Sequence, residues 1–266
     1  MREFFGFGPA DNPYGGTPDG YLSWQHIVFV SVFVLLAIGL AIFLGLRNKN
    51  KDYTAKNKVL IYTAIIIDLF EITKIIIGSV HNPNFWKMSL PLFLCSIQLI
   101  TIPLAAFCKG RLKEAALDFV LIFGMVGGLL GTYGMASNYN TYPTISWPNF
   151  VSAVTHCMSG FAALYIAFSN MASLKKKNIL ITFAILFSFA ILAYIANLAL
   201  NYNYMFLMFH DGTPYVIFYN LVNGNKLLYP LLVMSLFVVY VVLFYMIALK
   251  IKTKKSQLKE DSTMTY

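Results

Sequence analysis

A few ionisable and nucleophilic side chains lie inside long apolar runs of this sequence. Asp68, Glu71 and Lys74 share one such run. On a helix they spread over about 120°, which is one face, and Glu71 and Lys74 have the favourable i,i+3 spacing. A charged side chain at the centre of a bilayer costs about 2.5–3.5 kcal/mol on insertion scales. The three residues therefore predict either a structural ion pair or a functional group, such as a proton relay or the acidic member of a catalytic site.

Cys95 and His156 form a second candidate pair, each placed in a different apolar run. At 1.5 Å of rise per residue, both lie about 10 Å below the outer boundary of the membrane, as does Glu71. A thiol, an imidazole and a carboxylate at one depth can act as nucleophile, base and orienting acid. The alternative is that Cys95 and His156 are ordinary packing residues, since a buried cysteine behaves as a small hydrophobe.

The composition identifies the elements that must position these groups. The 266 residues are 58% hydrophobic and only 12% charged, whereas soluble domains are about a quarter charged. Seven runs approach the ~20 residues that a helix needs to cross the hydrocarbon core. They cover residues 23–46, 58–78, 88–107, 115–135, 149–168, 178–200 and 228–250. We therefore predict an all-α, multi-pass protein of the cell membrane, because strands of a β-barrel would alternate apolar and polar residues.

The net charge of +9 is distributed unevenly between the two sides of the predicted bundle. Sixteen of the twenty basic residues follow the first, third, fifth and seventh runs, and the other side carries only Arg2, Lys87 and Lys226. The positive-inside rule then places the N-terminus outside and the C-terminus in the cytoplasm. Residues 1–22 become an extracytoplasmic tail, 23–250 the seven-helix domain and 251–266 a basic cytoplasmic tail. The basic residues at the predicted cytoplasmic ends are expected to contact anionic lipid. A nucleic-acid partner is not predicted, because the sequence has no basic surface interleaved with aromatic residues.

Prolines and glycines predict further local features. Residues 88–107 are expected to form one helix, with Pro91 tolerated in its first turn and Pro103 kinking its lower half. The run 115–135 carries five glycines, which predict a face for close packing against another helix. These are Gly124, Gly127, Gly128, Gly131 and Gly134.

Neither a metal nor a cofactor is predicted. The four histidines lie on four separate segments without metal-ligand spacing. The aromatic, Gly- and Pro-containing loop at 201–227 is expected to sit in the interfacial belt or to cap a cavity.

Several short motifs resemble a known family. They are Leu90-Pro-Leu-Phe-Leu-Cys95-Ser, Thr155-His-Cys157, Asn203-Tyr-Met-Phe-Leu207 and Gly212-Thr-Pro214. They resemble the YwaF-type integral membrane proteins of bacteria, which are similar to the eukaryotic transmembrane protein 164, an acyltransferase implicated in ether-phospholipid remodelling. The resemblance implies that Cys95 is the acyl carrier and His156 its companion. Many members have a second histidine two residues before the cysteine, where this chain has Phe93.

The leading hypothesis is a phospholipid acyltransferase or acyl hydrolase that works in the outer half of the bilayer. Cys95 would be the nucleophile, His156 the base and Glu71 the acid that orients it. Gln98 and Asn197 are the candidate oxyanion donors, and Asp68, Lys74 and Tyr194 complete the predicted substrate site.

The alternative hypothesis is a seven-helix transporter or ligand-sensing receptor that uses the face of Asp68, Glu71 and Lys74. Under the leading hypothesis, Cys95, His156 and Glu71 converge on one pocket that is capped by the 201–227 loop.

Overall fold

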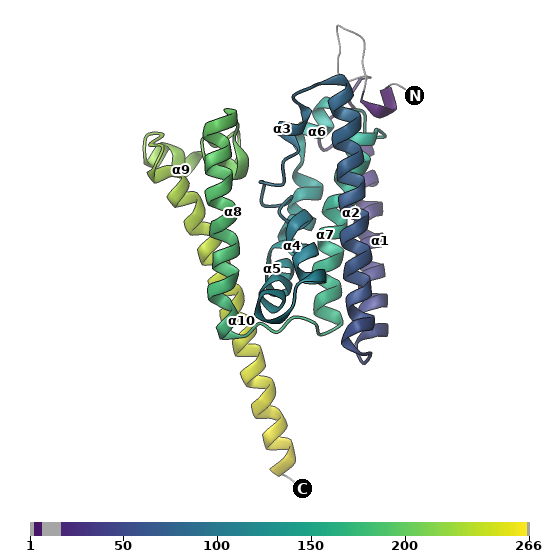
Figure 1. Cartoon of the computed structure of the whole chain (residues 1–266), viewed down its shortest axis with the longest axis vertical. Helices are drawn as coiled ribbons and strands as arrows, with labels where there is room; N and C mark the ends of the chain where they lie inside the picture. Colours follow the sequence, from purple (N-terminus) through teal and green to yellow (C-terminus); the bar gives the residue numbers. More distant parts are fainter. Residues whose placement is uncertain (1–2, 7–16, 265–266) are drawn as a thin grey trace. The chain divides into compact units, whose positions relative to one another are not determined.

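The structure, a computed structural model, describes residues 3–6 and 17–264, and this part of the chain contains helices and no strand (Figure 1). It divides into two compact units, Met1–Ala172 and Ser173–Tyr266. The helices of the first unit are η1 (Glu3–Phe5), α1 (Trp24–Asn48), α2 (Tyr53–His81), α3 (Phe85–Met88), α4 (Gln98–Phe107), α5 (Gly110–Gly134), α6 (Ala136–Thr141) and α7 (Trp147–Phe168). Those of the second are η2 (Lys176–Asn178), α8 (Ile179–Leu200), η3 (Tyr204–Phe206), α9 (Val216–Leu221) and α10 (Leu228–Met264).

Helix α7 is the central element of the first unit, where it packs against α5, α1 and α2. Helix α4 lies between α2 and α5 and contacts both. Local hydrogen bonds define where two of the long helices begin. The Ser23 hydroxyl accepts from the His26 N–H at 3.2 Å, and Asp52 Oδ2 accepts from the Ala55 N–H at 3.1 Å. Both are side-chain N-caps, which satisfy donors that a helix start leaves free.

Glycines bring α5 and α7 into backbone contact. A Cβ added to Gly128 would lie 2.6 Å from the Gly160 Cα, and one added to Gly124 would lie 2.8 Å from the Ser159 carbonyl oxygen. Small residues at a helix interface allow this approach in a membrane, where dispersion contacts rather than hydrophobic burial hold helices together. The predicted close packing against another helix is therefore confirmed at Gly124 and Gly128, whereas nothing lies within 4 Å of a Cβ added to Gly134.

The second unit pairs α8 with α10, and a hydrogen bond of 2.9 Å joins the Thr182 and Tyr245 hydroxyls. Helix α8 ends at Asn201, which adopts the left-handed conformation with φ of 51°. The loop beyond it is held by side-chain amides. Asn203 accepts from the Met208 N–H at 3.0 Å and donates to the Phe209 carbonyl at 2.9 Å.

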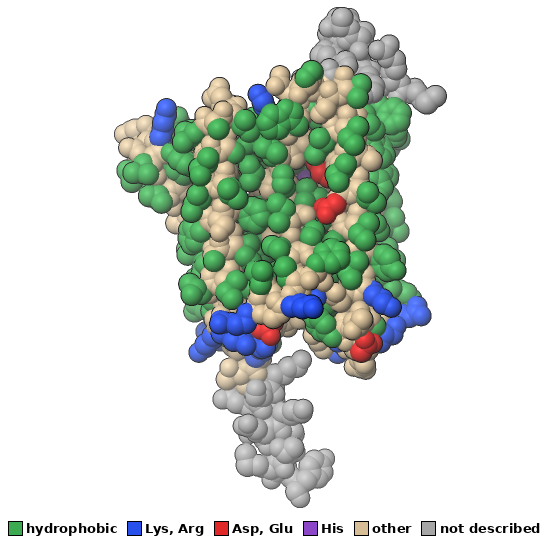
Figure 2. Space-filling model, viewed as in Figure 1, with side chains coloured by type: hydrophobic (Ala, Val, Ile, Leu, Met, Phe, Trp, Pro, Cys, Tyr) green, Lys and Arg blue, Asp and Glu red, His purple; other side chains and the backbone are tan. Residues whose placement is uncertain are grey.

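Among the described residues, five helical segments are long and apolar enough to cross a membrane: Trp24–Asn48, Gly110–Thr141, Trp147–Phe168, Lys176–Leu200 and Leu228–Lys254. Helix α2 has 29 residues but carries the three charged residues of the predicted polar face, and α4 has only 10 residues. Figure 2 shows apolar side chains over most of the visible face and acidic side chains interrupting it near α2. The chain is thus an all-helical membrane protein, while the count of seven spans and their orientation stay predictions.

The tails predicted at the two ends lie partly outside the described residues, which omit 1–2, 7–16 and 265–266. At the C-terminus, α10 continues beyond residue 250 as far as Met264. The basic segment predicted as a tail therefore extends the last long helix.

The prediction of one continuous helix over 88–107 is wrong. Residues 89–97 form turns and bends, and only Gln98–Phe107 is a regular helix. Pro91 disfavours a helical conformation at the residue before it. In addition, the Ser96 hydroxyl accepts from the Phe93 N–H and donates to the Phe93 carbonyl, both at 3.1 Å, so a local turn replaces helical hydrogen bonds. Cys95 consequently lies in a turn.

Replacing Gly128 with alanine tests the contact between α5 and α7. The added Cβ would collide with the Gly160 backbone, and overpacking of this kind costs about 1–3 kcal/mol. We expect Gly128→Ala to lower the thermal unfolding midpoint of the purified protein in detergent. Gly39→Ala is the matched control, because Gly39 lies within α1 and an added Cβ there meets nothing within 4 Å. Equal midpoints for the two variants would contradict the close packing.

Candidate functional site

An ion pair on α2 forms one side of the candidate site. Lys74 Nζ lies 2.6 Å from Glu71 Oε1, and the two side chains are 17% and 9% exposed. The sequence predicted this pairing at i,i+3 spacing, and the structure confirms the contact. Asp68 lies about one turn before Glu71 and is half-buried, and the charge of Glu71 acts on it. The face therefore holds two carboxylates and one ammonium.

Cys95 lies against α5. Its Cα is 3.6 Å and its Cβ 3.8 Å from the position that a Cβ on Gly127 would take. The turn that carries the thiol therefore packs against α5 at Gly127, where an added Cβ would make ordinary van der Waals contact with it. This turn conformation departs from the predicted helix, yet it still places the half-buried cysteine against α5.

His156 comes from α7 and packs on the next turn of α5. Its Nδ1 lies 2.3 Å from the position that a Cβ on Gly131 would take, so only glycine leaves room for the ring. The side chain is 6% exposed, and the ring interacts with the Gly127 backbone. Its buried Nδ1 has no hydrogen-bond partner in the described part of the chain. An unpartnered imidazole nitrogen in the bundle interior is available to exchange a proton.

Cys95 and His156 thus lie against adjacent turns of the same glycine face of α5. Gly127 and Gly131 are four residues apart, and positions with that spacing are neighbours on a helix surface, about 5–6 Å apart. The ammonium of Lys74 acts electrostatically on both the Cys95 thiol and the His156 ring, and Glu71 acts on the thiol. Four segments, α2, the turn at 89–97, α5 and α7, therefore contribute to one cluster.

Gln98 begins α4, three residues after Cys95, and is fully buried. Its Oε1 accepts from the Thr101 hydroxyl at 2.9 Å, while its Nε2 has no partner among the described residues. A buried amide nitrogen without an acceptor is costly. It could therefore serve as a donor to a developing oxyanion, which is the role predicted for it.

Asn197 and Tyr194 belong to the second unit, and both have local partners. The Asn197 amide donates to the Tyr204 carbonyl at 3.0 Å and accepts from the Tyr204 N–H at 2.6 Å. The Tyr194 hydroxyl donates to the Lys226 carbonyl at 3.3 Å. These bonds give both residues a part in holding the loop that follows α8, and their predicted roles toward a substrate stay predictions.

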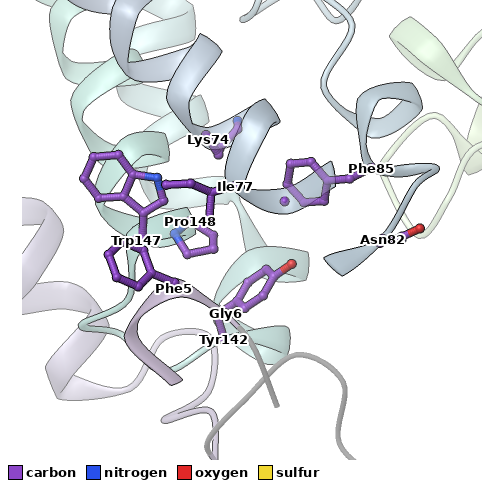
Figure 3. Close-up of a pocket in the computed structure, with 10 residues that line it drawn as sticks. Phe5, Gly6, Lys74, Ile77, Asn82, Phe85, Tyr142, Trp147 and Pro148 are labelled. Carbon is purple, nitrogen blue, oxygen red and sulfur yellow. The ribbon is translucent and has the colours of Figure 1, made fainter. Parts of the chain in front are cut away.

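Two features of the site were missed in the sequence. Gly127 and Gly131 were assigned to helix packing alone. They are four residues apart on one face of α5, and Cys95 lies at the first and His156 at the second. A pocket beside Lys74 was also missed, because its walls come from residues far apart in the chain. Trp147, at the start of α7, is one of its lining residues (Figure 3), and no sequence motif around it indicates a pocket.

Within residues 3–6 and 17–264, no group of three or more His, Cys, Asp or Glu side chains is placed to hold a metal ion.

The apolar helices and the buried polar cluster together define a helical membrane protein with a candidate site in its interior. The chain belongs to the TMEM164 family, whose model matches residues 21–249. Neither a curated protein nor a solved structure matches it. The family match supports the predicted likeness to transmembrane protein 164 but not the YwaF-type bacterial assignment.

Breaking the ion pair on α2 should destabilise the protein. Removing one partner of a buried pair leaves an uncompensated charge and costs about 3–5 kcal/mol. We expect Lys74→Met to lower the unfolding midpoint clearly, and the double variant Glu71→Gln with Lys74→Met to regain most of the loss. Lys87→Met, on α3, is the control for loss of a lysine. A double variant no more stable than Lys74→Met alone would show that the two charges do not depend on each other.

Proposed function

We propose that this protein is a phospholipid acyltransferase or acyl hydrolase in which Cys95 is the nucleophile and His156 the base. The observation that carries the proposal is the shared glycine face of α5, where Cys95 lies against Gly127 and His156 against Gly131. Covalent acyl transfer needs a nucleophile and a base within reach of each other, and the two candidate groups lie against adjacent turns of one helix face.

The proposed reaction has two halves. In the first, His156 takes the proton of the Cys95 thiol, and the thiolate attacks the carbonyl carbon of a phospholipid ester. The ester C–O bond breaks, a thioester forms on Cys95, and the released alkoxide takes the proton from His156. In the second half, His156 removes a proton from the hydroxyl of a lysolipid or from water. That oxygen attacks the thioester, and the Cys95 thiolate leaves and is reprotonated.

The neighbouring groups support this chemistry. The charges of Lys74 and Glu71 both act on the Cys95 thiol, so the ion pair on α2 is part of its electrostatic environment. Glu71 holds Lys74 through the 2.6 Å ion pair and acts as a positioning residue. The unpartnered Gln98 Nε2 is the candidate donor to the tetrahedral oxyanion.

The proposal includes the predicted membrane arrangement. Seven segments cross the cell membrane, with the N-terminus outside and the C-terminus in the cytoplasm. This orientation places the cluster of Cys95 and His156 in the outer half of the bilayer. Phospholipid esters lie just beneath the headgroups, so this depth suits a phospholipid substrate.

Lipid turnover by purified protein in defined phospholipid vesicles tests the proposal. We expect Cys95→Ala to abolish transfer or release of the acyl chain. We expect His156→Gln to slow it by about 100-fold or more, since a positioned general base contributes roughly 10²–10⁴-fold. Cys108→Ala is the matched control, because Cys108 ends α4 and lies outside the cluster. Full turnover in Cys95→Ala would contradict the mechanism.

A second candidate function rests on the charges of α2. Glu71 pairs with Lys74 and its charge also acts on Asp68, and a face with two carboxylates and one ammonium suits proton-coupled transport or ligand sensing. Under this alternative, uptake of a solute into proteoliposomes depends on a proton gradient and is lost in Glu71→Gln, whereas Cys95→Ala is unaffected. The two variants therefore separate the two functions.

A further inference from the structure

Two runs of lysines meet at one end of the second unit. The first run lies in and just before η2 and leads into α8, and the second lies where the apolar part of α10 ends. All six residues are exposed: Lys175, Lys176 and Lys177 in the first run, and Lys250, Lys252 and Lys254 in the second. Figure 2 shows basic side chains gathered at the level where α8 begins. Over residues 173–254 the sequence has one acidic residue, Asp211, which lies in the loop beyond the other end of α8.

Hydrogen bonds bring Lys252 to the first run. Its ammonium donates to the Ser173 carbonyl, and the Asn178 amide donates to the Ser173 hydroxyl at 2.7 Å. The bond of 2.9 Å between Thr182 and Tyr245 joins the same two helices. Tyr245 and Lys252 are seven residues apart, so they lie on one face of α10. That face of α10 is therefore directed at α8 and at the lysines that precede it.

The other two lysines of α10 lie on its opposite face. At 100° per residue, Lys250 and Lys254 are each about 160° around the helix from Lys252. A helix with its side chains is about 10–12 Å across, whereas charges are screened over about 8 Å at physiological salt. A single ligand therefore meets the charges of Lys252 and of residues 175–177, which together we call the lysine cluster.

The surroundings of the lysine cluster suit a lipid. Both runs lie at the ends of the segments that are long and apolar enough to cross a membrane. Leu180, one turn beyond Lys176, is 78% exposed, and Ile251, next to Lys252, is 60% exposed. Lysines at the end of a membrane span lie among lipid headgroups, while apolar side chains beside them contact acyl chains. A soluble polyanion would contact the lysines alone.

We infer that the lysine cluster binds the phosphate of an anionic phospholipid whose acyl chains lie along the apolar sides of α8 and α10. Phosphatidylglycerol is a lipid of this class, because nothing in its headgroup cancels the phosphate charge. Phosphatidylcholine carries the same phosphate together with a quaternary ammonium group, which the lysines would repel. The inference does not rest on the proposed acyl transfer, since no lysine of the cluster belongs to the site around Cys95 and His156.

Counting the lipids that stay bound to the purified protein tests this site. The protein in maltoside detergent is titrated with phosphatidylglycerol or with phosphatidylcholine of the same acyl chains. Mass spectrometry of the intact protein then gives the fraction that carries lipid. We expect phosphatidylglycerol to bind at least about tenfold more tightly. Each lysine near an anionic headgroup contributes about fivefold in affinity, so Lys176→Gln with Lys252→Gln should weaken binding by about 25-fold.

The matched control is Lys250→Gln with Lys254→Gln, which removes the same charge from the opposite face of α10. We expect its affinity to stay within about twofold of the unmodified protein, because screening separates it from the ligand. Lys175→Gln with Lys176→Gln keeps the bond from Lys252 to Ser173 and should also weaken binding by about 25-fold. Losses in this variant no larger than in the control would overturn the site.

The nature of the ligand is tested with the same titration. Equal affinity for phosphatidylglycerol and phosphatidylcholine would overturn recognition of an anionic headgroup. Glycerophosphoglycerol has the headgroup of phosphatidylglycerol without its acyl chains, and we expect it to bind much more weakly. If it bound as tightly as the lipid, the ligand would be a free phosphate diester and the assignment to a lipid would be wrong.

Discussion

The contact between Gly128 of α5 and Gly160 of α7 is the constraint on which the candidate site depends. It brings the two backbones close enough that α7 can place the His156 ring over Gly131. The same face of α5 receives Cys95 at Gly127, one turn away. A side chain at Gly128 would push against the α7 backbone, and one at Gly131 would displace the His156 ring. The glycine face of α5 therefore determines both how closely α5 and α7 pack and where the candidate side chains lie.

The second organising feature is the charge carried by α2. An ion pair buried in a membrane protein contributes little net stability, since desolvation offsets the attraction between its partners. The position of Glu71 and Lys74 instead suggests an electrostatic role in the candidate site. Lys74 acts on Cys95 and on His156, and it lines the same pocket as Trp147. A single ammonium thus acts on both proposed reacting groups and also lines the neighbouring pocket.

Some of this arrangement could be predicted from the sequence. Apolar run length predicted the long helices, and i,i+3 spacing predicted the ion pair between Glu71 and Lys74. The helix expected over 88–107 was wrong, because Ser96 and Pro91 favour a turn that hydropathy does not register. The pocket joins residues as distant in the chain as Phe5, Lys74 and Trp147. Such contacts depend on tertiary packing, which the pattern of a single sequence does not reveal.

The central claim is that Cys95 carries the acyl group, and trapping the acylated protein tests it most directly. The protein is mixed with a phospholipid of defined acyl chains, quenched in acid and digested for mass spectrometry. Our account predicts that the mass of the acyl chain appears on the peptide containing Cys95 and is removed by hydroxylamine, as a thioester is. An acyl group found instead on Cys108 or Cys157, or no acyl group on any cysteine while lipid turnover proceeds, would contradict it.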